Sequence, residues 1–153
     1  MTGEWTFIPL AAANRVTALS LVNAYYAGEG YDFSPADIER AFNEITGRDG
    51  LGHLWLIERA GEAVGYLCLA AGFALEAGGR DFFLDEIFII PEARGVGLGS
   101  AALVFAEDSA KILGARRMNL VTERANPRAR AFYEARGYAT HDRDMLSKDL
   151  FGD

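Results

Sequence analysis

An arginine and three glycines stand between an apolar run and a helical pattern, in Arg94-Gly95-Val96-Gly97-Leu98-Gly99-Ser100. A turn from strand to helix aims unpaired backbone N–H groups at an anion, and the helix dipole adds to the attraction. Glycine lets the backbone approach a phosphate closely and adopt positive φ angles. The Arg94 guanidinium adds a fixed positive charge at the edge of the turn. The segment therefore predicts a phosphate-binding turn.

Two familiar phosphate motifs do not fit these glycines. The dinucleotide fingerprint G-x-G-x-x-G fails because neither Ser100 nor Ala102, the two positions that would close it, is a glycine. The P-loop fails because no lysine follows the glycines. The pattern R-x-x-G-x-G fits residues 94–99. With it the segment resembles the GNAT acetyltransferases, in which this turn holds the pyrophosphate of acetyl-coenzyme A (acetyl-CoA).

Residues 126–138 are similar to a second cofactor motif of that family, with Asn126 and Tyr133 seven positions apart and a Gly-Tyr pair after them. The resemblance covers nearly the whole chain and implies the GNAT fold with acetyl-CoA as cofactor. It also implies that Tyr133 protonates the departing thiolate and that a backbone N–H near Ile89 polarises the thioester carbonyl. A helix cap at Asn126 and a packed ring at Tyr133 are the structural alternatives. The residues expected at the cofactor are Ile87, Phe88, Ile89, Arg94, Gly95, Val96, Gly97, Leu98, Gly99, Ser100, Asn126 and Tyr133.

Two carboxylates, Asp85 and Glu86, stand just ahead of the cofactor-binding end of the strand. An alkylamine with a pKa of about 10.4 is mostly protonated at neutral pH, so acylation needs a base to remove its proton. The pair resembles that of diamine and polyamine acetyltransferases and predicts this base. In a regular strand the two side chains point to opposite faces, so they would not share one role. A solvated acidic pair is the alternative, and Glu123 is a second candidate base.

A loop of acids and aromatics at residues 29–33 lines the acceptor site if the resemblance holds. Carboxylates and aromatic faces both attract an ammonium group. The expected substrate-binding residues are therefore Asp85, Glu86, Glu29, Tyr31 and Asp32. A surface loop with aromatics packed into the core is the alternative.

The hydrophobic pattern predicts the elements that position these residues. Strands are expected at residues 5–8, 54–58, 63–75, 81–90, 117–122 and 143–150, and helices at 11–26, 34–47, 95–113 and 126–137. Ser34, followed by proline, predicts the cap of the second helix. We expect an α/β (α+β) fold, with a mixed, mostly antiparallel sheet flanked by helices, in a single domain over residues 1–153.

Composition narrows the function further. The net charge of −7 argues against nucleic-acid binding and is compatible with a cationic substrate. The longest charge-free runs, 16–28 and 63–75, are shorter than the roughly 20 residues of a membrane-spanning helix. The single cysteine, Cys68, predicts a reducing, cytoplasmic setting. Two distant histidines and one cysteine predict no metal site.

The sequence predicts an acetyl-CoA-dependent N-acetyltransferase that acts on the primary amine of a small, cationic molecule. Direct attack in a ternary complex is expected, because no protein nucleophile is required. A protein N-terminal or lysine acetyltransferase and a catalytically silent acyl-CoA-binding domain are the alternatives, since many functions share one fold. A homodimer is compatible with the family resemblance.

Overall fold

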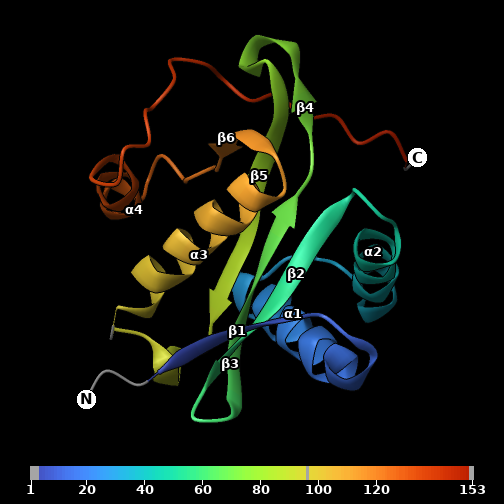
Figure 1. Ribbon diagram of the computed structural model, residues 1–153. Helices are drawn as coiled ribbons and strands as arrows, with labels where there is room; N and C mark the ends of the chain where they lie inside the picture. Colours follow the sequence, from blue (N-terminus) through green and yellow to red (C-terminus); the bar gives the residue numbers. More distant parts are fainter. Residues whose placement is uncertain (1–3, 96, 152–153) are drawn as a thin grey trace. The chain divides into compact units, whose positions relative to one another are not determined.

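The computed structural model describes residues 4–95 and 97–151 (Figure 1). The chain divides into two compact units, Met1–Leu120 and Val121–Asp153, so the expectation of one domain over the whole chain stays a prediction. The first unit contains β1 (Trp5–Pro9), α1 (Arg15–Glu29), α2 (Pro35–Gly47), β2 (Gly52–Arg59), β3 (Glu62–Ala70), β4 (Phe73–Ala74), β5 (Gly79–Ile89), α3 (Leu98–Ile112) and β6 (Ala115–Asn119). The second unit contains α4 (Pro127–Glu134).

The strands of the first unit form one sheet in the order β1-β2-β3-β5-β4, and β6 pairs with β5 off this path. Every pair is antiparallel except β5 with β6, which is parallel. The expected mixed, mostly antiparallel sheet is confirmed. The strand expected over residues 63–75 is divided in two: β3 ends at Ala70, and the short strand β4 continues its path along β5.

Local sequence signals explain several boundaries. Ala60 and Gly61 both have positive φ angles, 52° and 79°, and connect the antiparallel strands β2 and β3 in the hairpin that the sequence predicts. The side chain of Ser34 accepts a hydrogen bond from the backbone N–H of Asp37 and caps α2 as predicted. The helix α1 extends to Glu29, beyond the expected end, and stops at Gly30, whose φ is 70°.

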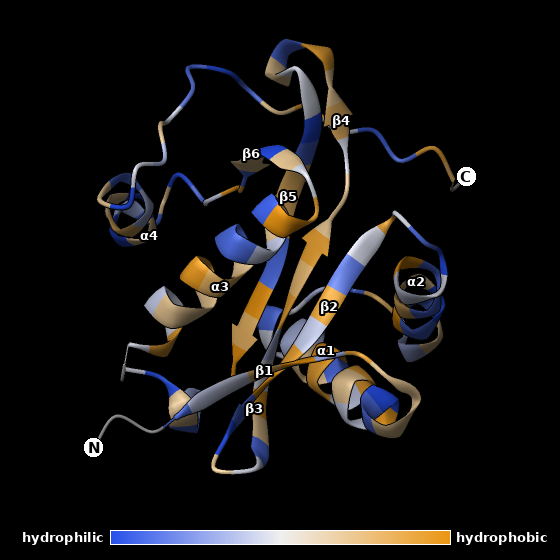
Figure 2. Cartoon of the chain, in the orientation of Figure 1, coloured by the Kyte–Doolittle hydropathy of each residue, from blue (hydrophilic) through white to orange (hydrophobic). Residues whose placement is uncertain are grey.

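Helices cover both faces of the sheet (Figure 1). On one face, alternate residues of β2, β3 and β5 form a core with α1 and α2: Ala18, Val22, Phe42, Leu54, Leu56, Tyr66, Cys68 and Phe88. On the other face, the ring of Phe105 from α3 stacks on Phe7 at 4.2 Å between ring centroids and meets Trp55 edge-on at 5.4 Å. Figure 2 shows β3, at the centre of the sheet, as mainly hydrophobic, which fits a strand covered on both sides.

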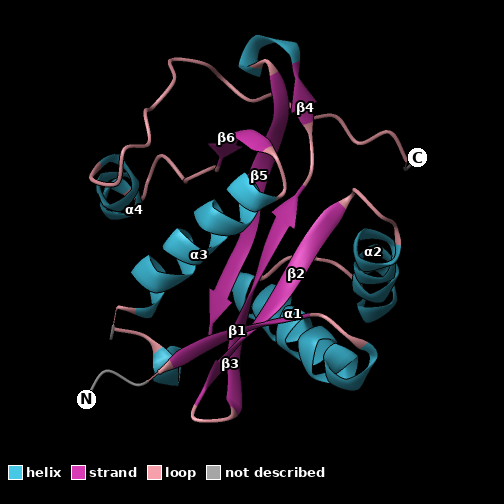
Figure 3. Ribbon diagram, viewed as in Figure 1, coloured by secondary structure: helices cyan, strands magenta, loops and turns pink. Residues whose placement is uncertain are grey.

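The strand expected at residues 143–150 is wrong. In the second unit the described chain after α4 has no helix or strand (Figure 3). A strand needs a hydrogen-bonded neighbour, and these residues pair with none of the described strands. Leu146 and Leu150 are 91% and 82% exposed, so their alternation with polar residues does not define a buried face.

None of the helices in the described residues is long and apolar enough to cross a membrane.

Candidate active site

An irregularity in β5 determines where Asp85 and Glu86 point. Glu86 pairs with Cys68 of β3, and Leu84 pairs with the residue that follows Cys68. Asp85 therefore has no residue opposite it, which is the arrangement of a β-bulge and shifts the alternation of side chains by one residue. Opposite faces were expected only for a regular strand. This strand is not regular, and both carboxylates line the same pocket.

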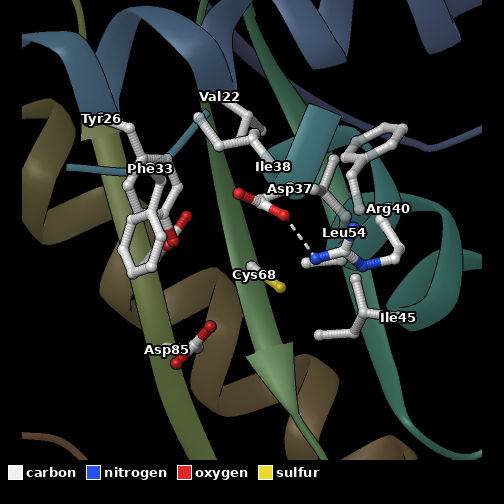
Figure 4. A pocket seen from close by; sticks show the side chains of 13 residues that line it. Val22, Tyr26, Phe33, Asp37, Ile38, Arg40, Ile45, Leu54, Cys68 and Asp85 are labelled. Carbon is white, nitrogen blue, oxygen red and sulfur yellow. Dashed lines mark hydrogen bonds and ion pairs between the residues drawn. The ribbon is translucent and has the colours of Figure 1, made fainter. Parts of the chain in front are cut away.

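The pocket lies between α1, α2 and the sheet and has a volume of about 520 Å³ (Figure 4). Pockets that bind small molecules usually measure about 300–1,000 Å³. Asp85 and Glu86 come from β5, and the aromatic residues Tyr26 and Phe33 line the same pocket. Most of the remaining wall is apolar and comes from Val22, Ile38, Ala41, Phe42, Ile45 and Leu54.

Glu86 is held by two tyrosine hydroxyls from different elements. Tyr66 of β3 donates a hydrogen bond to Oε2 at 2.5 Å, and Tyr26 of α1 donates one to Oε1. Burial raises the pKa of the Glu86 carboxyl, and the two hydrogen bonds, which favour the ionised form, offset only part of that rise. Burial, and then the Glu86 carboxylate, raise the pKa of both tyrosines, which therefore stay protonated and act as donors.

Asp85 differs from its neighbour in its partners. Among the described residues, no side chain donates a hydrogen bond to the Asp85 carboxylate. Asp85 is an exposed residue and lines the pocket. The walls around it still remove part of its hydration, which raises the pKa of its carboxyl. Asp85 is thus a carboxylate with an increased proton affinity and open access.

Cys68 also lines the pocket, but its surroundings disfavour a thiolate. The residue is 4% exposed. Burial, and then the negative charges of Asp85 and Glu86, raise the pKa of its thiol. A protonated thiol is a poor nucleophile.

The wall formed by α2 carries an ion pair. Arg40 and Asp37 are joined at 2.5 Å, and the Ser34 hydroxyl donates a second hydrogen bond to the Asp37 carboxylate at 2.6 Å. The bonds from Ser34 and then Arg40 lower the pKa of Asp37. Both oxygens of this carboxylate therefore already have a partner, and its charge is offset by a neighbouring cation.

The glycine turn has the geometry expected of an anion site. Gly95 and Gly97 adopt φ angles of 84° and 81°, and Gly97, the N-cap residue of α3, supplies no side-chain cap. A Cβ at either position, or at Gly99, would meet no atom within 4 Å, so the backbone lies open. Arg94 donates a 2.7 Å hydrogen bond from Nε to the Ile89 carbonyl, which fixes it beside the turn. These features fit a bound pyrophosphate.

The other expected cofactor residues divide into two groups. Leu98 is buried at the start of α3 and supports the turn, while Ser100 follows it in the first turn of the helix. Ile87, Phe88 and Ile89 form the end of β5, and Phe88 is buried in the core. Val96 lies outside the described residues.

The edge of β5 beyond Phe83 is open within the described residues of the first unit, because β6 pairs only with Arg80–Phe83. Ile90 donates its N–H to the Val64 carbonyl of β3. Backbone N–H groups point alternately to the two sides of an antiparallel strand. Because the N–H of Ile90 points toward β3, the N–H of Ile89 points away from β3, toward the open edge. The Ile89 carbonyl, which accepts from Arg94, fits this orientation. Within the described residues of the first unit this N–H has no strand partner, and it can donate to a carbonyl oxygen.

In the second unit, the side chain of Asn126 accepts a hydrogen bond from the N–H of Ala129 and caps α4. Tyr133 lies on α4, where its ring contacts Phe132 and Tyr138 with centroids 5.1 Å and 5.7 Å away. Burial raises the pKa of the Tyr133 hydroxyl, which therefore keeps its proton at neutral pH. The helix cap that the sequence predicts at Asn126 is confirmed.

Of the expected substrate residues, Asp85 and Glu86 line the pocket, whereas Glu29, Tyr31 and Asp32 do not. The Tyr31 ring packs against Tyr26 and Phe33, with centroids 5.5 Å and 5.9 Å away. The roles predicted for these loop residues stay predictions.

Phe33, in the loop at residues 29–33 that was expected at the acceptor site, lines the pocket. Sequence reasoning missed Tyr26 and Tyr66 as parts of the site. For Tyr26 the sequence predicted only a place at the end of the helix expected over residues 11–26. No sequence signal joins these residues to Glu86, because the contacts depend on how separate elements pack.

Comparison with known proteins agrees with this geometry. The uncharacterized N-acetyltransferase YhfO of Bacillus subtilis (strain 168) is 36% identical over 83 residues, which are 54% of this chain and 56% of that protein. An aminoalkylphosphonate N-acetyltransferase of Salmonella typhimurium is 34% identical over 86 residues, 56% of each chain. The alignments thus span little more than half the length of these relatives.

The fold is also found in solved structures. The aminoglycoside N-acetyltransferase AAC(6')-Iy in complex with CoA superimposes with a TM-score of 0.80 at 16% identity, over 99% of this chain and 98% of that one. Residues 18–138 match the model of the acetyltransferase (GNAT) family. The match covers most of the chain, including the glycine turn and Tyr133. The chain therefore belongs to the acetyltransferase (GNAT) family.

Proposed function

We propose that the protein transfers an acetyl group from acetyl-CoA to the primary amine of a small, cationic molecule, by direct attack in a ternary complex. The observation that carries this proposal is the pair of carboxylates, Asp85 and Glu86, in one pocket of small-molecule size. The pair lies on the strand that leads to the open Ile89 edge and the glycine turn. Acceptor site and cofactor turn are thus connected by β5.

The glycine turn holds the cofactor in this proposal. The backbone N–H groups at the start of α3 and the Arg94 guanidinium bind the pyrophosphate. When bound, acetyl-CoA supplies the acetyl group as a thioester. The N–H of Ile89 is the donor that we assign to the thioester carbonyl, because preorganised donors stabilise developing negative charge.

We assign different roles to the two carboxylates. Both oxygens of Glu86 are occupied by tyrosine hydroxyls, so this side chain is fixed and attracts the ammonium group by its charge. Asp85 has no such side-chain donor among the described residues, and burial raises the pKa of its carboxyl toward neutral pH. A general base works best when its pKa approaches the operating pH. Asp85 therefore takes the proton from the amine.

Tyr133 is the group that we propose for the last proton transfer. Its burial keeps the hydroxyl proton in place. A phenol with a pKa of about 10 or above is a reasonable donor to a thiolate whose conjugate acid has a pKa of about 8.5. The proton on Tyr133 Oη would then neutralise the thiolate leaving group.

The test is a thiol-release assay with acetyl-CoA and a panel of acceptors. The panel contains diamines, polyamines, aminoglycosides, amino acids, peptides and, because of the Salmonella relative, an aminoalkylphosphonate. Thiol release with a small cationic amine supports the proposal. Release only with peptides assigns the protein to the acetyltransferases of protein amines. Acetyl-CoA binding by calorimetry without release from any acceptor identifies a silent binding domain.

A further inference from the structure

We infer that the acceptor carries one positive charge on an apolar, hydrocarbon body. This inference rests on the proposed function and concerns the same pocket. The carboxylates of β5 bind the ammonium group of the acceptor. The polarity of the other pocket walls determines which chemical groups the rest of the acceptor can carry.

The walls beyond the carboxylates offer few polar partners. Helices α1 and α2 and strand β2 contribute Val22, Ile38, Ala41, Phe42, Ile45 and Leu54. A hydroxyl or amine group buried against such a wall loses its hydrogen bonds to water without replacement, whereas a hydrocarbon surface gains by leaving water. The wall therefore favours alkyl and aryl groups over sugars or polyamine chains.

The aromatic rings fit the same molecule. Tyr26 and Phe33 line the pocket together with the carboxylates, and Tyr26 donates a hydrogen bond to Glu86. The two rings, labelled in Figure 4, have centroids 5.8 Å apart in an edge-on arrangement. Aromatic faces attract an ammonium group and pack well against hydrocarbon. The ammonium end of the acceptor thus meets both carboxylates and rings.

A second ammonium group would find no free partner on the opposite wall. Asp37 is the carboxylate contributed by α2, but Arg40 and Ser34 already occupy its oxygens. A diamine that spans the pocket would bring its second charge near the Arg40 guanidinium. Like charges at close range disfavour binding. Among the described residues that line the pocket, Asp85 and Glu86 thus form the one negative centre that makes no ion pair with a cation.

The experiment compares hexylamine with 1,6-diaminohexane, which have the same chain length and differ by one ammonium group. We expect kcat/KM for hexylamine to exceed that for the diamine by about 10- to 100-fold, in the range by which an apolar pocket rejects a polar group. 2-Phenylethylamine should also be a good acceptor. A diamine that equals or exceeds hexylamine would overturn the inference.

A variant isolates the role of the ion pair. Arg40→Gln removes the cation and leaves Asp37 as a second negative centre. Arg40 is 71% exposed, so the fold should tolerate the change. We expect the preference for hexylamine over the diamine to fall several-fold. The matched control is Arg48→Gln, which breaks the pair with Glu44 on the same helix, is 70% exposed and lies outside the pocket lining. An unchanged preference in Arg40→Gln would contradict the assigned role of Arg40.

Failure of this inference can be distinguished from failure of the proposed function. If hexylamine and 2-phenylethylamine are inactive while an aminoglycoside or amino acid is acetylated, the inference is wrong and acetyl transfer to small amines stands. If no amine releases thiol although calorimetry detects acetyl-CoA binding, the proposed function itself is wrong.

Discussion

The hydroxyl of Tyr66 donates a 2.5 Å hydrogen bond to Oε2 of Glu86 and so joins β3 to β5 inside the pocket. Tyr66 is 0% exposed, and its ring packs against Tyr25 and Phe88. A donor on a ring fixed in this way holds the carboxylate in one position. Glu86 is therefore oriented by the core of the protein rather than by solvent.

Tyr66→Phe keeps the ring and removes this donor. Burial raises the folded-state pKa of Glu86 above its unfolded value, and loss of the bond should raise it further. The stability that such a group contributes is present below the unfolded pKa and is lost as pH rises through the folded pKa. We expect urea unfolding to show a loss of about 1–2 kcal/mol at neutral pH and a smaller loss near pH 4.3, about the unfolded pKa.

Tyr25→Phe is the control, because the Tyr25 hydroxyl makes no hydrogen bond to Glu86 among the described residues and its pKa, raised to about 12, leaves it neutral. Equal losses in both variants at both pH values would show that the Tyr66 bond does not act on Glu86.

Asp85→Asn and Glu86→Gln separate the base from the fixed carboxylate. Without a base at position 85, kcat should fall by about 10²- to 10⁴-fold, and the acidic limb of the pH–rate profile should disappear. Glu86→Gln should mainly raise KM for a cationic amine, because it removes a charge and leaves Asp85 in place. The measurement is kcat and KM against pH with one good acceptor. The reverse pattern, with the acidic limb lost only in Glu86→Gln, would assign the base to Glu86.

Local signals were sufficient for much of the fold. The cap at Ser34, the turn at Ala60-Gly61 and the glycine turn before α3 each depend on a few adjacent residues. The expected strand at 143–150 failed because alternation alone supplies no neighbouring strand to pair with. Pairing is a property of distant segments, which a local pattern does not contain.

The candidate site was predictable only in part for the same reason. The types of Asp85 and Glu86 indicated a base, but the bulge that turns both toward one pocket depends on the register between β3 and β5. The donors Tyr26 and Tyr66 reach Glu86 from α1 and β3, 60 and 20 positions away in sequence. Such contacts arise from the packing of separate elements, and the spacing of these residues in the sequence does not predict them.

Gly99→Val tests the cofactor turn without straining the backbone. Gly97 has a φ of 81°, so any side chain there would be strained whatever its effect on binding. Gly99 lies in α3 without a positive φ, and its Cβ would enter open space. We expect Gly99→Val to weaken acetyl-CoA binding at least about 10-fold in calorimetry, because the side chain covers the N–H groups at the helix start.

Gly28→Val, at a helical glycine of α1 that is equally open, controls for the cost of valine in a helix. Unchanged acetyl-CoA affinity in Gly99→Val would move the pyrophosphate site away from this turn.

Tyr133→Phe tests the proposed proton donor. Its raised pKa keeps the hydroxyl protonated at neutral pH, so the wild-type donor is present throughout the working range. We expect kcat to fall by about 10- to 10⁴-fold with little change in acetyl-CoA affinity. An equal kcat in wild type and Tyr133→Phe would leave Tyr133 with a packing role only.

Cys68→Ala tests direct transfer against a covalent acetyl-enzyme. Cys68 is the only cysteine of the chain and lines the acceptor pocket, so it is the thiol on which an acetyl group could be held. Its burial and the nearby carboxylates raise the pKa of the thiol and keep it protonated, which makes it a poor nucleophile. We expect Cys68→Ala to retain kcat within about threefold, because deletion of one small buried atom disturbs the wall only slightly.

Mass spectrometry of the wild-type protein after incubation with acetyl-CoA alone should show no added acetyl group. An acetylated Cys68 that disappears when amine is added, together with loss of turnover in Cys68→Ala, would replace direct attack with a two-step transfer through the thiol.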